Sequence, residues 1–116
     1  MSKEKWLGVV NNANGQIVEL RKSAPKVLGG FGELAKQATR NGELSPKTKE
    51  LIALAIGIAV RCDGCLAFHA KAAADEGATR QEVVETIGVA IYMGGGPSMI
   101  YGAEALDAFD AFAEKG

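Results

Sequence analysis

The sequence predicts an all-α protein of about six helices. Apolar residues recur at spacings of three and four along most of the 116 residues, which is the period of an amphipathic helix. No stretch of any length alternates apolar and polar residues, so no β-strand is expected. Proline, glycine and capping residues fall between the periodic stretches, where helices would begin and end. We expect the chain to form one domain over residues 1–116.

The first two helices are predicted at residues 3–22 and 25–39. Pro25 separates them, because proline disfavours helical backbone at the residue before it and fits the first turn of the helix that it opens. Asparagines and Gly15 weaken the middle of the first helix, and its charged flanks indicate a surface element. The second helix has an apolar stripe formed by Val27, Leu28, Phe31, Leu34, Ala35 and Ala38.

The third helix is predicted at residues 46–61, with Ser45 as its N-cap. The segment Leu51–Val60 is apolar on every side of this helix, so we expect it to be buried all round. Gly57 within it would allow another backbone to approach closely. Glu50, just before this segment, is either a solvated carboxylate near the helix N-terminus or a functional group.

The remaining helices are predicted at residues 63–76, 80–93 and 97–114. Asp63 is a candidate N-cap for the first of these, and Thr79 with Glu82 fits a capping box for the second. The glycine run before Pro97 is interpreted as a helix–helix connection, because it lacks the Lys-Ser/Thr of a phosphate loop. The last helix is expected to direct inward Met99, Ile100, Ala103, Leu106, Phe109, Phe112 and Ala113.

Both cysteines and the single histidine lie within eight positions, Cys62 to His69. Two thiols separated by Asp63 and Gly64 can close a disulfide across a turn. On a helix, Cys65 and His69 would lie one turn apart on one face, where an imidazole can accept the thiol proton or stabilise the thiolate. This segment therefore predicts a nucleophile, a resolving thiol and a base.

Other interpretations of this segment remain open. Cys-x2-Cys is half of a zinc site, but two cysteines and one histidine fall short of the four ligands of a structural zinc, so no metal is expected. Attachment of a c-type haem needs histidine directly after the second cysteine, where this chain has Leu66. The cysteines could also be buried and inert beside a core histidine.

Composition limits the class of function. Thirteen basic and fourteen acidic residues give a net charge of −1, which offers no electrostatic attraction to nucleic acid or anionic membrane. The N-terminus lacks the features of a signal peptide, and the longest apolar run is too short to cross a bilayer, so a cytoplasmic location is expected. The long apolar faces of so small a chain predict a homo-oligomer.

The spacing Glu50-x11-Cys62-x2-Cys65-x3-His69, followed by an alanine-rich helix and the Gly-x-Thr-x2-Glu start of the next, resembles the alkylhydroperoxidase D (AhpD)-like branch of the carboxymuconolactone decarboxylase superfamily. The resemblance covers residues 25–112 and is strongest over 46–93. It implies an all-helical fold whose subunits interlock as dimers, trimers or hexamers, of which a trimer or hexamer is expected here. It also implies a thiol-dependent peroxidase activity. Members of the decarboxylase branch generally lack the cysteine pair.

Carried over to this chain, the resemblance implies that Cys65 is the peroxidatic cysteine, Cys62 the resolving one, and His69 and Glu50 the proton relay. The best-studied members also have a histidine directly before the second cysteine, where this chain has Gly64. The expected partners are a small peroxide and an external dithiol, without metal, haem or flavin. The alternatives are a general thiol–disulfide oxidoreductase, a decarboxylase-like enzyme acting on a small lactone, and a non-catalytic oligomeric binding protein.

Overall fold

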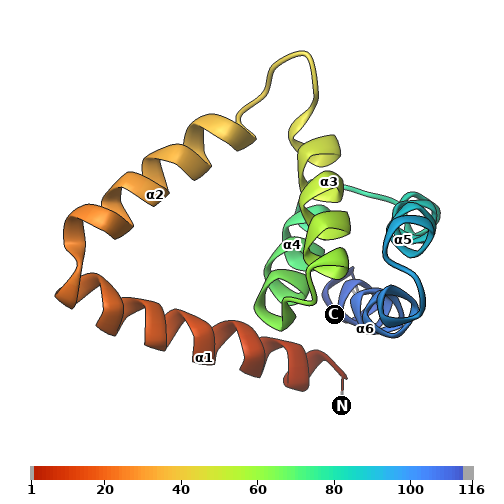
Figure 1. The fold of residues 1–116 in the computed structure, drawn as a ribbon, viewed down its shortest axis with the longest axis horizontal. Coiled ribbons are helices and arrows are strands. Elements are labelled where there is room, and N and C mark those ends of the chain that lie inside the picture. The colour runs from red at the N-terminus through yellow and green to blue at the C-terminus, as the bar shows by residue number, and fades with distance from the viewer. Residues whose placement is uncertain (1, 114–116) are drawn as a thin grey trace.

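The computed structural model describes residues 2–113 and consists of six helices, with no strand in that range (Figure 1). The prediction of an all-α fold is confirmed, and the predicted helix ends lie within a few residues of the observed ones. In chain order the helices are α1 (Ser2–Ser23), α2 (Pro25–Thr39), α3 (Pro46–Ala59), α4 (Asp63–Asp75), α5 (Arg80–Gly94) and α6 (Gly96–Ala113).

Helices α3 to α6 pack against one another and form the body of the molecule. Its core is made of aliphatic side chains from α3, α4 and α5 and of alanines from α4 and α6; the largest fully buried apolar members are Leu54, Ile58, Leu66 and Val83. Gly102 permits the contact between α6 and α5, because a Cβ at this position would lie 2.6 Å from Ile87 Cγ2. Close helix packing therefore depends on small residues at these crossings.

Helices α1 and α2 form an arm that leaves the body and returns to it (Figure 1). The N-terminal part of α1 is anchored, since Trp6 and Val10 are buried and Trp6 Nε1 donates a 2.8 Å hydrogen bond to Asp107 Oδ2 of α6. The asparagine-rich middle does not interrupt α1. Beyond Val10 the helix diverges from the body, so the arm encloses a space between itself and α4.

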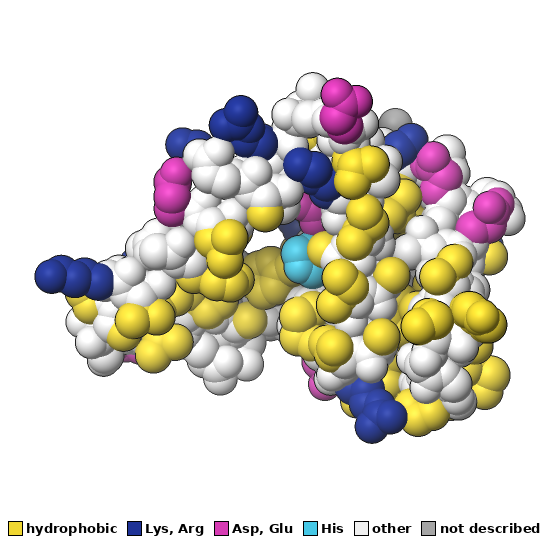
Figure 2. Space-filling model, turned by 45° about the horizontal axis from the view of Figure 1, so that its top comes forward, with side chains coloured by type: hydrophobic (Ala, Val, Ile, Leu, Met, Phe, Trp, Pro, Cys, Tyr) yellow, Lys and Arg dark blue, Asp and Glu magenta, His cyan; other side chains and the backbone are white. Residues whose placement is uncertain are grey.

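Helix α2 has no buried residue. Its apolar stripe includes Val27, Phe31 and Leu34, which are 71%, 65% and 62% exposed. Hydrophobic side chains also gather on the body, over α3 and the helices beside it (Figure 2). Within residues 2–113, large apolar side chains are therefore exposed both on α2 and on α3 of the body.

Two expectations about buried faces are wrong for the single chain. Leu51–Val60 is not buried all round, because Ile52, Ile56 and Val60 are 45%, 57% and 65% exposed on the side of α3 away from the core. In the predicted inward set of α6, Met99, Ile100, Ala103 and Ala113 are exposed, whereas Phe109 is buried and Leu106 and Phe112 pack against the core. The inward face of α6 consists mainly of smaller residues, Ser98, Gly102, Ala105, Ala108 and Ala111, because tight crossings exclude large side chains.

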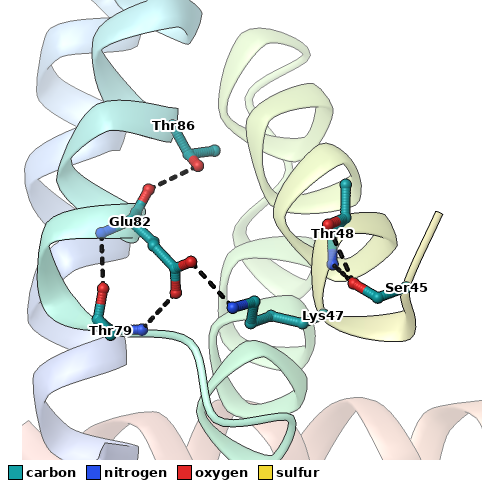
Figure 3. A network of polar contacts seen from close by, with 6 residues as sticks. All are labelled: Ser45, Lys47, Thr48, Thr79, Glu82 and Thr86. Carbon is teal, nitrogen blue, oxygen red and sulfur yellow. Dashed lines mark hydrogen bonds and ion pairs between the residues drawn. The ribbon is translucent and has the colours of Figure 1, made fainter.

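The N-termini of α3 and α5 are capped as the sequence predicts (Figure 3). Ser45 Oγ accepts the Thr48 N–H at 3.1 Å. Thr79 and Glu82 form the predicted reciprocal capping box, with contacts of 3.0 and 2.8 Å. The Glu82 carboxylate also accepts from Lys47 Nζ at 2.9 Å, which joins the start of α5 to α3. The backbone N–H of Thr79, with Lys47 adding to it, lowers the pKa of Glu82.

Candidate functional site

The turn between α3 and α4 places the first cysteine. Arg61 has a left-handed backbone with φ of 60°. The Arg61 N–H donates to Ile58 O at 3.2 Å and the Cys62 N–H to Gly57 O at 3.0 Å, the bond pattern of a Schellman motif. This motif ends α3 and leads directly into α4, so Cys62 is held at the N-terminus of the next helix.

Cys62 and Cys65 are joined by a disulfide, with their Cα atoms 5.2 Å apart. The N-cap of α4 is Cys62, whose Sγ accepts the Cys65 N–H at 3.2 Å. The expectation that Asp63 caps this helix is therefore wrong; Asp63 is its first residue. A sulfur at this position lies where the helix dipole favours negative charge, which stabilises a thiolate there when the pair is reduced.

Gly57 of α3 allows Cys65 to approach that helix. A Cβ at position 57 would lie 2.9 Å from Cys65 Cβ, closer than real Cβ atoms come to such neighbours. The expectation that Gly57 permits a close backbone approach is confirmed, and the group that approaches is the second cysteine. The position of the disulfide therefore depends on Gly57 of α3, which has no side chain to obstruct Cys65.

His69 of α4 and Glu50 of α3 form the second part of the site. His69 Nδ1 lies 2.8 Å from Glu50 Oε1, and the Glu50 side chain is only 14% exposed. Glu50 is therefore not a solvated surface carboxylate. Because an ionised carboxylate can only accept, the contact assigns the proton to Nδ1 and leaves Nε2 as the free nitrogen. Between residues 2 and 113 no hydrogen bond joins the imidazole to either sulfur.

A cavity of about 640 Å³ lies between the arm and α4, and the disulfide and His69 are in its wall. Figure 2 shows the corresponding hollow, with hydrophobic side chains around it and the histidine at its edge. The arm contributes Ala13, Asn14, Ile17 and Arg21 from α1 and Leu28, Phe31, Gly32 and Ala35 from α2. The α4 side contributes Cys62, Gly64, Cys65, Phe68 and His69.

The structure thus brings the four predicted residues into one region, where Cys62, Cys65 and His69 line the cavity and Glu50 holds His69 from behind. Sequence reasoning missed the wall supplied by the arm. The apolar stripe of α2 was visible in the sequence, but nothing in a periodic pattern indicates that it faces the cysteines across a gap. Within residues 2–113, no group of three or more His, Cys, Asp or Glu side chains is arranged to hold a metal ion, and no helix is long and apolar enough to cross a membrane.

Comparisons with known proteins agree with this fold. The model of the carboxymuconolactone decarboxylase family matches residues 25–108. An uncharacterised protein of Cupriavidus necator is 39% identical over 98 residues, covering 84% of this chain and 87% of the relative. An uncharacterised protein of the cox locus of Paracoccus denitrificans is 32% identical over 98 residues, covering 84% of this chain and 88% of that protein.

A solved structure is similar over nearly its whole length. The crystal structure of a carboxymuconolactone decarboxylase family protein from Legionella pneumophila superimposes with a TM-score of 0.92 at 45% identity, covering 96% of this chain and 99% of that one. The two proteins therefore share their fold, and their sequence identity is high enough to place them in the same family. This chain belongs to the carboxymuconolactone decarboxylase family.

Proposed function

We propose that this protein is a thiol-dependent peroxidase of the AhpD-like branch, which reduces hydroperoxides through Cys62 and Cys65. The observation that carries the proposal is the Cys62–Cys65 disulfide in the wall of the cavity that also contains His69. His69 is itself held by Glu50 at 2.8 Å. A cysteine pair with its Cα atoms 5.2 Å apart can cycle between dithiol and disulfide and so carry two electrons.

In the first step of the proposal, Cys65 is the nucleophile. In the reduced protein, His69 Nε2 takes the Cys65 thiol proton, and Glu50 stabilises the imidazolium through Nδ1. The thiolate attacks the terminal oxygen of the hydroperoxide, an S–O bond forms and the O–O bond breaks. The leaving alkoxide takes the proton back from His69 and departs as an alcohol, while Cys65 becomes a sulfenic acid.

In the second step, Cys62 resolves the sulfenic acid. Its sulfur attacks the Cys65 sulfur, the S–O bond breaks, and hydroxide leaves with the Cys62 proton as water. The product is the disulfide, with Cα atoms 5.2 Å apart in the structure, within the usual range for a disulfide. An external dithiol then reduces it by two successive exchanges and is itself oxidised to a disulfide.

The N-cap position of Cys62 favours a second candidate function, general thiol–disulfide exchange. The Sγ of Cys62 accepts the Cys65 N–H at the helix N-terminus, a setting that lowers a thiol pKa. Cys62 would then be the attacking thiol, and no peroxide would be needed. Decarboxylation of a small lactone is supported by the name of the family model and by no group of this site.

We also propose that the protein is a homo-oligomer, because α2 buries nothing in the single chain. Completely burying a Val, Leu or Phe side chain contributes about 1.5–3 kcal/mol. Val27, Phe31 and Leu34 of α2 are each more than three-fifths exposed, and the outer face of α3 adds Ile52, Ile56 and Val60. A second copy that covers these residues would stabilise the arm.

The proposed activity is tested by peroxide consumption. Pre-reduced protein is mixed with cumene hydroperoxide and excess dithiothreitol, and loss of hydroperoxide is followed together with the thiol count. We expect catalytic turnover in the wild type, none in Cys65→Ser, and slower turnover in His69→Ala by about 10²–10⁴-fold. If the wild type leaves the hydroperoxide unchanged but catalyses disulfide exchange between small thiols, the exchange function replaces the peroxidase function.

A further inference from the structure

The cavity beside the disulfide has a feature that the proposed chemistry does not use, an unpaired cation in an otherwise largely apolar wall. Arg21 of α1 is part of this wall. Within residues 2–113 its guanidinium has no hydrogen bond or ion pair, whereas Arg40 bonds to Gln37 and Arg80 to Asp110. The other α1 side chains in the wall are Ala13, Asn14 and Ile17.

The geometry of the arm separates this cation from the redox pair. Helix α1 is anchored on the body through Trp6 and Val10 and diverges from it toward the corner with α2 (Figure 1). Ala13 and Arg21 are eight residues apart, which is about 12 Å of helix. Along the helix axis, Arg21 therefore lies about 12 Å nearer the corner with α2 than Ala13 does, whereas the disulfide lies in the wall formed by α4.

We propose that Arg21 binds the carboxylate of an elongated apolar substrate whose other part reaches the disulfide. The inference rests on the proposed function for the reaction, but the binding itself does not require it. A guanidinium recognises a carboxylate through two parallel N–H donors. Ile17 and Leu28, which line the same cavity, supply apolar surface for a hydrocarbon chain. The substrate class is a hydroperoxide of a medium-chain carboxylic acid.

Binding is measured first, on the native protein as purified with its disulfide intact. Equilibrium dialysis with octanoate and with octanol separates the charge from the chain. We expect octanoate to bind more tightly than octanol, and Arg21→Gln to weaken octanoate by about fivefold, a value set by a partly exposed charge pair, with octanol unchanged. Arg21→Lys should recover part of the loss. Affinity should rise from butyrate to octanoate, by up to about fourfold for each added CH₂.

Lys22→Gln is the matched control, because it removes the same charge one residue along α1. Lys22 is not in the cavity wall and lies 3.5 Å from Glu19. It should bind octanoate as the wild type does. Equal affinity for octanoate and octanol, an unchanged octanoate affinity in Arg21→Gln, an equal loss in Lys22→Gln, or no binding of either probe would each overturn the proposal.

Kinetics with the reduced protein then connects the site to the reaction. A hydroperoxy fatty acid should have a lower KM than its methyl ester in the wild type; Arg21→Gln should remove this difference by raising the KM of the acid, whereas Lys22→Gln should keep it. If neither fatty hydroperoxide nor hydrogen peroxide is consumed, the peroxidase proposal fails, and the dialysis result still decides the carboxylate site. If the acid and the ester have equal KM values, the carboxylate proposal fails and the peroxidase proposal stands.

Discussion

The contact between Gly57 and Cys65 gives the sharpest prediction about how the fold positions the site. Replacing Gly57 by alanine places a methyl group 2.9 Å from Cys65 Cβ and 3.8 Å from its carbonyl carbon. Neither neighbour is the far end of a flexible side chain, so the helices must move apart. Overpacking of this kind costs about 1–3 kcal/mol, while exchanging glycine for alanine inside a helix contributes about 1 kcal/mol of stability. The expected net change ranges from about zero to 2 kcal/mol of destabilisation.

The matched control is Gly88→Ala, in the interior of α5. A Cβ at Gly88 meets nothing within 4 Å, so this variant should gain the helix propensity of about 1 kcal/mol without a steric cost. The free energies of unfolding of the two variants should therefore differ by about 1–3 kcal/mol. The assay is urea denaturation at one protein concentration, because subunit association contributes to apparent stability. If Gly57→Ala stabilises the protein as much as Gly88→Ala, the close approach of α3 to the disulfide is not as described.

Three further predictions concern one residue each, Arg61, Asp107 and Leu34. Arg61→Gly should raise the free energy of unfolding by about 0.5–1 kcal/mol in urea melts, because Arg61 has a φ of 60° that glycine adopts without strain. A free energy of unfolding equal to or below that of the wild type would contradict backbone strain at this turn. The hydrogen bond from Trp6 lowers the pKa of Asp107 below its ordinary 3.8, so its contribution to stability is complete above that pH and is lost as pH falls through the lowered pKa. Asp107→Asn should accordingly be less stable than the wild type at pH 7, with the gap closing below pH 3.8; a gap that is independent of pH in acid urea melts would refute the assignment. Leu34→Asp should reduce the mass measured by sedimentation equilibrium, because Leu34 is 62% exposed on the apolar face of α2. Lys36→Asp, on the opposite face of that helix, should leave the mass unchanged. Equal masses for Leu34→Asp and the wild type would refute a role of the apolar face in association.

The elements and the reactive residues could be predicted because their signals are local. Caps and prolines mark helix ends within a few positions, and the i, i+4 relation of Cys65 to His69 follows from a helix alone. Spacing also suggested Glu50, but only the packing of α3 on α4 brings its carboxylate to 2.8 Å from His69 Nδ1. That contact is tertiary, and a sequence pattern cannot give its distance.

The missed features depend on how helices cross. In α6 the tight crossings select Gly102 and the alanines for the inside and leave Met99 and Ile100 outside, so counting large apolar residues identified only part of the inward face, Leu106, Phe109 and Phe112. The N-cap of α4 falls on Cys62 because the Schellman turn at Arg61 sets where the helix begins, whereas composition favoured Asp63. The wall supplied by the arm depends on the angle between α1 and α2, which no short-range pattern specifies.

The central claim is that Cys65 is the thiol that attacks peroxide, with His69 and Glu50 serving it. The direct measurement is single-turnover trapping of sulfenic acid with dimedone in two reduced variants, Cys62→Ser and Cys65→Ser, each mixed with one equivalent of cumene hydroperoxide and analysed by mass spectrometry. We expect dimedone on Cys65 in Cys62→Ser, slower labelling when His69→Ala or Glu50→Gln is added, and no label in Cys65→Ser. Labelling of Cys62 in Cys65→Ser, with Cys65 unlabelled in Cys62→Ser, would show instead that the N-cap cysteine, Cys62, is the nucleophile.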